Sequence, residues 1–227
     1  MSGTLVCAHR GASGYLPENS LDAFASAIAM GSDGIETDLR RTPDGRLVLA
    51  HDPLPAMPPD GLVELAQLVA MAAGRVRLDV ELKEPGYEAQ VLDALTPRPD
   101  GLLVTSFIPD VVAAVRALDR TVRTGLILGP WDESPDRFAR ADECGADVLV
   151  PHVDLLDDGL RARALERGSR LVVWTVNERE ALAQAIADPA VGCVITDLPD
   201  VALELCGRAF APHATAPANP SRRRRIA

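Results

Sequence analysis

Two of the four histidines in this 227-residue chain end apolar runs, and they enclose a pair of carboxylates. His9 follows the run LVCA, His51 follows LVLA, and Glu36 and Asp38 lie between them, separated by one residue. Side chains alternate along a strand, so these two carboxylates would share a face and need a cation or a shared proton. Imidazole titrates near neutral pH and serves as a general acid or base. The spacing therefore predicts acid–base chemistry beside a carboxylate cluster.

A second run, DVELK at residues 79–83, repeats this alternation and places Glu81 on one face with Asp79 and Lys83. Three carboxylates suit a hard divalent cation, Mg²⁺ or Ca²⁺, that keeps coordination positions open for water or substrate. Zinc would prefer nitrogen and sulfur ligands. We therefore predict a metal site built from Glu36, Asp38 and Glu81.

The position of His51 follows from a turn signal, TPDG at residues 42–45. If Asp44 and Gly45 reverse the chain, the run RLVLAH returns as a hairpin and brings His51 opposite Asp38 or its near neighbours. Arg10 and Lys83 add a planar guanidinium and a point charge, which suit phosphate oxygens. A metal ion and two basic side chains around two histidines favour phosphoryl transfer with acid–base assistance.

Eight runs rich in Val, Ile and Leu, which are typical of strands buried on both faces, carry these residues. The runs are residues 4–10, 34–39, 76–82, 101–107, 123–128, 147–152, 170–176 and 192–197. Helical spacing separates most of them, at residues 18–31, 109–118, 157–168 and 178–188. The first helix has Asn19 or Ser20 to cap its start and Gly31 its end.

This alternation predicts an α/β fold, a (β/α)₈ TIM barrel in a single domain. An open doubly wound sheet is the alternative, but no GxGxxG or P-loop motif supports it. Active sites of such barrels lie at the C-terminal ends of the strands. The polar residues at those ends are His9, Arg10, Glu36, Asp38, Glu81, Lys83, Ser106, His152, Thr175, Asn177, Thr196 and Asp197.

The net charge of −10 argues against nonspecific nucleic-acid binding and requires local positive groups to capture an anionic substrate. The four cysteines form no CxxC pair, so we expect reduced thiols. The N-terminus has no secretory pattern and no run reaches membrane-spanning length, so we expect a cytoplasmic protein without stable membrane insertion. The Ala/Pro/Arg-rich residues 212–227 are typical of a disordered tail that follows a domain at residues 1–211.

The segment from His9 to Pro53, HRGASGYLPENS through LVLAHDP, resembles the opening of the glycerophosphodiester phosphodiesterase family, within the phospholipase-C-like TIM-barrel superfamily. DVELKEP, VVWTVNE and VITDLPD extend the resemblance to about residue 205. The resemblance implies that His9 and His51 are the catalytic pair and that Glu36, Asp38 and Glu81 are the metal ligands. It also implies that Arg10 and Lys83 contact the phosphate. Glu18 and Asn19 would brace the site, and Trp174 would lie near the substrate. Thr196 and Asp197 match a terminal motif.

One region departs from the family. Residues 53–77 hold only a Pro-rich loop and one helical pattern where members carry an inserted lid, so the insertion after the second strand is reduced. The alcohol-side pocket is then more open, or is filled from another loop or subunit.

The expected activity is metal-dependent hydrolysis of glycerophosphodiesters to glycerol 3-phosphate and an alcohol, with a cyclic phosphate as the intermediate that the resemblance favours. Three alternatives stay open: lysophospholipase-D-like activity, an amidohydrolase-type barrel and a catalytically silent phosphodiester-binding barrel. The expected partner is a small phosphodiester rather than nucleic acid, and a homo-oligomer is left open.

Overall fold

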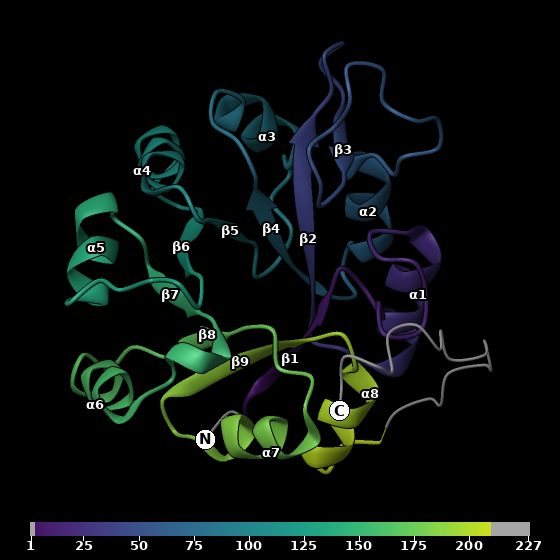
Figure 1. Cartoon of the computed structure of the whole chain (residues 1–227). Helices are drawn as coiled ribbons and strands as arrows, with labels where there is room; N and C mark the ends of the chain where they lie inside the picture. Colours follow the sequence, from purple (N-terminus) through teal and green to yellow (C-terminus); the bar gives the residue numbers. More distant parts are fainter. Residues whose placement is uncertain (1–2, 210–227) are drawn as a thin grey trace.

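Eight parallel strands alternate with helices and curl into a nearly closed barrel in the computed structural model, which describes residues 3–209 (Figure 1). The strands are β1 (Leu5–His9), β2 (Gly34–Arg41), β4 (Arg77–Leu82), β5 (Leu103–Ser106), β6 (Arg123–Leu128), β7 (Val148–Pro151), β8 (Leu171–Val173) and β9 (Val191–Thr196). They run in the order β7-β6-β5-β4-β2-β1-β9-β8. An isolated parallel bridge between His152 and Trp174 links β7 to β8 at the seam. The predicted single-domain barrel is confirmed, and the open sheet is excluded.

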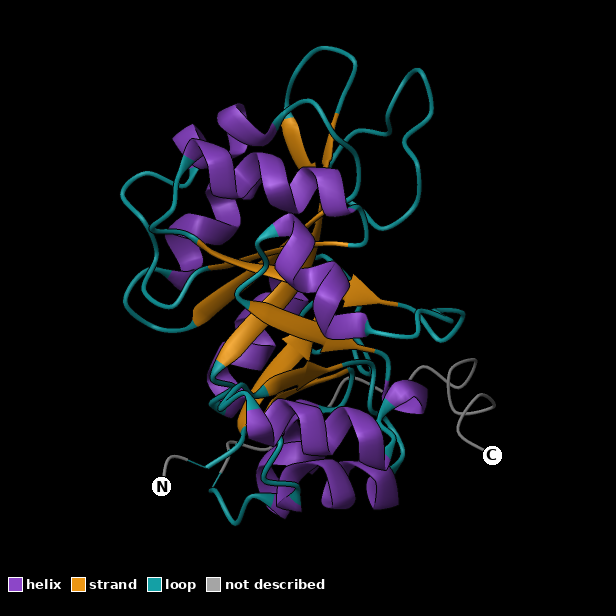
Figure 2. Ribbon diagram, turned by 90° about the vertical axis from the view of Figure 1, so that its left-hand side faces the viewer, coloured by secondary structure: helices purple, strands orange, loops and turns teal. Residues whose placement is uncertain are grey.

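The helices surround the strands as an outer layer (Figure 2). They are α1 (Leu21–Met30), α2 (Leu65–Ala72), α3 (Glu88–Ala94), α4 (Pro109–Leu118), α5 (Arg137–Cys144), α6 (Asp158–Glu166), α7 (Arg179–Ala187) and α8 (Pro199–Leu205), with a 3₁₀ turn at Val153–Leu155. The main apolar core lies between strands and helices. A smaller cluster of Cys7, Ile127, Val148, Val150 and Ile195 fills the barrel interior. Burial on both faces explains why the strands read as continuous apolar runs.

Helix α1 begins at the predicted position, but only one of the two candidate residues caps it. The hydroxyl of Ser20 accepts from the backbone N–H of Ala23, and Gly31 ends the helix in the left-handed region at φ +91°. Asn19 also has a positive φ, +55°, and its amide is bound elsewhere. The capping role proposed for Asn19 is therefore wrong.

The predicted hairpin forms between β2 and the short strand β3 (Leu47–Leu49), which pairs with β2 outside the barrel order. Leu39 pairs with Leu49, and the N–H of Ala50 donates to the carbonyl of Asp38 over 3.0 Å. His51 thus lies one residue beyond the position opposite Asp38, within the predicted range. A loop and α2 then lead to β4, in the segment where the sequence predicts a reduced insertion.

The four cysteines are free, as expected. Within residues 3–209, no helix combines the length and apolar character that a bilayer span requires. The predicted tail at residues 212–227 lies outside the described residues.

Candidate active site

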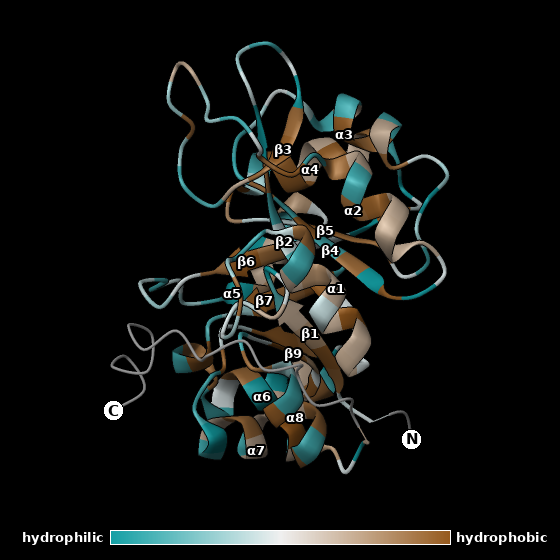
Figure 3. Ribbon diagram, turned by 90° about the vertical axis from the view of Figure 1, so that its right-hand side faces the viewer, coloured by the Kyte–Doolittle hydropathy of each residue, from teal (hydrophilic) through white to brown (hydrophobic). Residues whose placement is uncertain are grey.

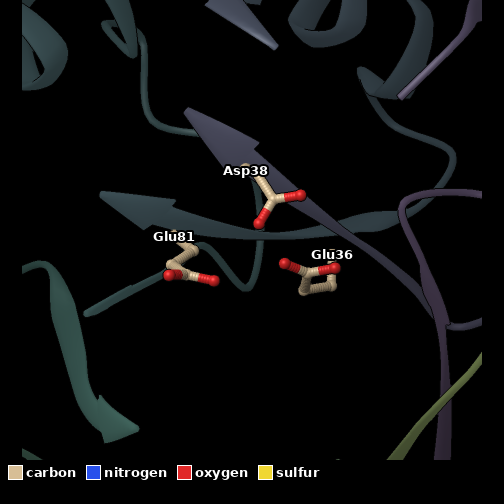
Figure 4. Close-up of side chains that lie close together, drawn as sticks. All are labelled: Glu36, Asp38 and Glu81. Atoms are coloured by element: carbon tan, nitrogen blue, oxygen red, sulfur yellow. The ribbon is translucent and has the colours of Figure 1, made fainter. Parts of the chain in front are cut away.

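Three carboxylates from two neighbouring strands meet inside the barrel (Figure 4). Glu36 and Asp38 share a face of β2, and the parallel register of β2 and β4 sets Asp38 beside Glu81. One oxygen of each lies within 4.8 Å of the others, and all three side chains are buried. The two-residue alternation that predicted this cluster is the cause of its geometry.

Burial and the repulsion between neighbouring carboxylates disfavour the ionised form of the two glutamates in this cluster. Burial and the charges of Asp38 and Glu81 raise the pKa of Glu36 well above its usual range. Burial raises the pKa of Glu81 to about 7, against the opposing effect of Lys83, and burial likewise raises the pKa of Asp79 to about 7. A divalent cation would favour the ionised form of every one of these groups.

The pKa of Asp38 is lowered instead of raised, because basic groups lie on both of its oxygens. Burial acts to raise its pKa, but Arg10 and Lys83 hold that pKa below the usual value. The Nε of Arg10 lies 2.8 Å and the Nζ of Lys83 lies 3.2 Å from its two oxygens. The amide of Asn19 donates to it over 3.0 Å, and Thr37 holds that amide by donating to its oxygen over 2.7 Å.

The two basic residues are themselves positioned by acids. Lys83 Nζ lies 2.7 Å from an oxygen of Glu81, and Arg10 Nη1 donates to Glu18 over 3.2 Å. Arg10 takes a positive φ of +55°, and its N–H donates to the carbonyl of Glu36 over 2.8 Å. Both cations are therefore fixed at the edge of the carboxylate cluster.

His9 is oriented by a partly buried acid, Asp197. Its Nδ1 lies 2.6 Å from Asp197, which also accepts hydrogen bonds from Ser13 and Asn177 over 2.9 Å each. Burial opposes ionisation of Asp197, yet the bonds from His9, Ser13 and Asn177 lower its pKa to about 2. The other ring nitrogen, Nε2, lies 3.8 Å from Glu36. The sequence indicated Asn177 only as a polar strand end and Asp197 as a strand end within a family motif of unassigned role, and it gave no signal for Ser13.

His51 is held mainly through its backbone. Its carbonyl accepts two hydrogen bonds from Arg40, from Nε over 3.1 Å and from Nη2 over 2.7 Å. Its ring Nδ1 lies 3.0 Å from the exposed Asp52. Arg40 also pairs with Glu84. Sequence reasoning missed Arg40, because an arginine on a strand carries no signal that separates it from a solvated one.

A cavity of about 320 Å³ opens over this constellation. Seven of the ten candidate residues line it: His9, Arg10, Glu36, His51, Glu81, Lys83 and Trp174. The other three, Asp38, Glu18 and Asn19, lie behind it in the contacts given above. The indole N–H of Trp174 donates to the carbonyl of Val150 over 2.9 Å. All ten are thus brought together, while the role of each stays a prediction.

Comparison with known proteins identifies the family. The model of the glycerophosphoryl diester phosphodiesterase family matches residues 9–73 and 79–201. The chain belongs to this family. It is therefore an enzyme, a phosphodiesterase, and the resemblance found in its motifs is confirmed.

Individual relatives cover most of the chain. A glycerophosphodiester phosphodiesterase of Caldanaerobacter subterraneus subsp. tengcongensis is 27% identical over 89% of this chain and 97% of its own. An Oleispira antarctica phosphodiesterase, solved in complex with its product sn-glycerol-3-phosphate, superposes with a TM-score of 0.81 at 20% identity over 90% of this chain and 97% of that one. The glycerophosphodiester phosphodiesterase of Thermotoga maritima superposes with a TM-score of 0.76 at 22% identity, over 92% of this chain and 100% of that one. These superpositions support the barrel.

Proposed function

We propose that this phosphodiesterase hydrolyses glycerophosphodiesters to glycerol 3-phosphate and an alcohol, using a divalent cation and the pair His9 and His51. The observation that carries the proposal is the placement of both histidines, Arg10 and Lys83 around one cavity beside the buried carboxylates. A barrel that only bound a phosphodiester would need the positive charge but not two titrating groups.

The carboxylate cluster fits a hard cation. Glu36, Asp38 and Glu81 offer oxygen donors only, within a span of 4.8 Å, and such donors suit Mg²⁺ or Ca²⁺. A histidine-rich ligand set, which an amidohydrolase-type barrel would need, is not found at this cluster. When bound there, the cation would supply charge neutralisation at a phosphate oxygen and lower the pKa of a hydroxyl beside it.

The two histidines can divide proton transfer between them. Asp197 occupies Nδ1 of His9 and leaves Nε2 directed at the cluster, as an acid–base group requires. His51 enters the cavity from the hairpin, with its backbone fixed by Arg40. Arg10 and Lys83 would hold the phosphate between the two imidazoles.

We extend the proposal to the route of bond cleavage. The 2-hydroxyl of the glycerol attacks phosphorus, so an O–P bond forms and the bond to the alcohol breaks. One histidine takes the hydroxyl proton while the other protonates the leaving oxygen. Water then opens the cyclic phosphate with the roles reversed. Two features support this route: the pairing of the histidines, and the proximity of a tethered hydroxyl, which has an effective molarity on the order of 10⁵–10⁸ M.

The test uses three compounds: glycerophosphoethanolamine, its analogue without the 2-hydroxyl, and glycerol cyclic phosphate. Mass spectrometry should show glycerol 3-phosphate from the first and the third, and His9→Ala should slow both reactions. The analogue should bind but turn over very slowly. Rapid hydrolysis of the analogue would leave direct water attack as the route. No turnover of glycerophosphoethanolamine or of any alkyl ester of glycerol 3-phosphate would overturn the function itself.

A further inference from the structure

An aromatic wall lines the cavity beside the charged groups. Phe107 follows β5, Trp131 lies in the loop after β6, and Trp174 follows β8. The rings of Phe107 and Trp131 stack with centroids 6.0 Å apart and planes at 18°. Phe107 meets Trp174 edge-on at 5.4 Å. Trp174 and Phe107 are half-buried, but Trp131 is 72% exposed, so the wall extends from the cavity to the solvent.

The loop that carries Trp131 is built to keep the indole in this place. A methyl group added at Gly129 would collide with the six-membered ring of Trp131, so the close approach requires glycine there. The N–H of Asp132 donates to the carbonyl of Gly129 over 2.9 Å, and the Asp132 carboxylate pairs with Arg140 of α5. The exposed indole therefore sits on an anchored turn.

This loop occupies the side of the barrel where the shortened insertion also lies. Figure 3 shows the segments that follow β3 and β6 projecting from the same side of the barrel. The segment after β3 holds no aromatic residue between Asp52 and Glu64. Within the described residues, the Phe and Trp side chains that line the cavity thus come from the segments after β5, β6 and β8.

The charge beside the wall selects the kind of group that it can bind. The Nζ of Lys83 lies 5.8 Å from the centroid of Phe107. A quaternary ammonium would have to compete with Lys83 for the face of the Phe107 ring, over which the lysine ammonium already lies. A neutral apolar group has no such penalty and gains from leaving water.

We propose that Trp131 is a specificity-determining residue that binds an apolar substituent of the phosphodiester, such as an alkyl chain. The inference rests on the proposed function. Lys83, which faces both the carboxylates and Phe107, places the phosphate next to the wall. An alkyl substituent that extends away from the phosphate would then lie along Phe107 and Trp131.

The experiment compares the methyl and hexyl esters of glycerol 3-phosphate, used as dissolved monomers in the presence of Mg²⁺. In the wild type, kcat/KM should rise on the order of 10-fold from methyl to hexyl, because five methylenes would be partly removed from water. A second pair consists of two methyl esters of glycerol 3-phosphate, one with a methyl ether and the other with a hexyl ether on the glycerol 1-oxygen. The pair that shows the larger rise identifies the side of the phosphate that carries the apolar group.

Three variants test the assignment. Trp131→Ala should reduce the hexyl advantage to less than about threefold, and Trp131→Phe should restore part of it. Gly129→Ala keeps the indole but displaces it, so it should also lose most of the advantage. Leu165→Ala, at another large exposed hydrophobic residue on α6, is the matched control and should retain the full advantage.

The inference is overturned if Trp131→Ala keeps the full hexyl advantage, or if the wild type shows none in either pair. It is also overturned if glycerophosphocholine is the better substrate and that preference disappears in Trp131→Ala. Each of these results requires turnover of the methyl ester. Failure of the wild type to hydrolyse any ester would instead refute the proposed function.

Discussion

His9 and His51 reach the same cavity from regions that differ in burial. His9 ends a buried barrel strand, its side chain is 14% exposed, and the partly buried Asp197 fixes its ring. His51 lies past the end of a hairpin strand, 41% exposed, beside an Asp52 that is 92% exposed. Its position depends on its carbonyl, which Arg40 binds. The fold thus orients one imidazole through its ring and the other through its backbone, so the neighbouring acids should contribute unequally.

The largest effects should come from removing the imidazoles. His9→Ala and His51→Ala should each lower kcat/KM on the order of 10²–10⁴-fold, because each removes one proton-transfer group. The double variant should lose much less than the product of the two losses, since the pair acts as a unit. Steady-state kinetics on glycerophosphoethanolamine measure this. Strictly multiplicative losses would show that the histidines act independently.

The two acids provide a sharper comparison. Asp197→Asn should lower kcat at least about tenfold and change the pH profile of kcat/KM, because the ring of His9 loses its charged partner. Asp52→Asn should cost less than about threefold, since an exposed pair contributes little. Far-ultraviolet circular dichroism controls for folding. Equal losses of kcat in Asp197→Asn and Asp52→Asn would contradict the prediction that the two acids contribute unequally.

Asp197 should also contribute to stability in a definite pH range. Its pKa in the folded protein, about 2, is below the usual value of 3.8. Its ionised form therefore stabilises the fold above about pH 4 by on the order of 2 kcal/mol, and this contribution is lost as the pH falls towards 2. Urea unfolding of the wild type and Asp197→Asn at pH 6 and pH 3.5 should show a smaller difference at the lower pH. A difference that grows on acidification would contradict this assignment.

The smallest effect should come from truncation after residue 211. The Ala/Pro-rich composition predicts no contribution to the core, so the free energy of unfolding should change by no more than about 0.5 kcal/mol. The kinetics with soluble substrates should change equally little. A large fall in melting temperature would show that these residues pack against the barrel.

The sequence predicted those features that depend on periodicity. The buried strands read as apolar runs, and the alternation along β2 and β4 is enough to predict that Glu36, Asp38 and Glu81 lie together. The hairpin also followed from local turn chemistry, because Asp44 and Gly45 fix where the chain reverses.

The features that were missed depend on contacts between segments far apart in the sequence. Ser13 binds Asp197 across 184 positions, and no local pattern marks such a pair. Local spacing left Asn19 and Ser20 as alternative helix caps, but a tertiary contact with Asp38 holds the amide of Asn19 away from the helix end. Trp131 stands alone in a loop, where no spacing relates it to Phe107.

The most direct test of the account is turnover of glycerophosphoethanolamine after exhaustive chelation, followed by addition of Mg²⁺ or Ca²⁺. The central claim is that Glu36, Asp38 and Glu81 hold a cation that the reaction requires. The wild type should lose nearly all activity and regain it with the metal. Glu81→Gln should regain little and bind the cation more weakly by calorimetry. Full activity of the chelated wild type would contradict the claim.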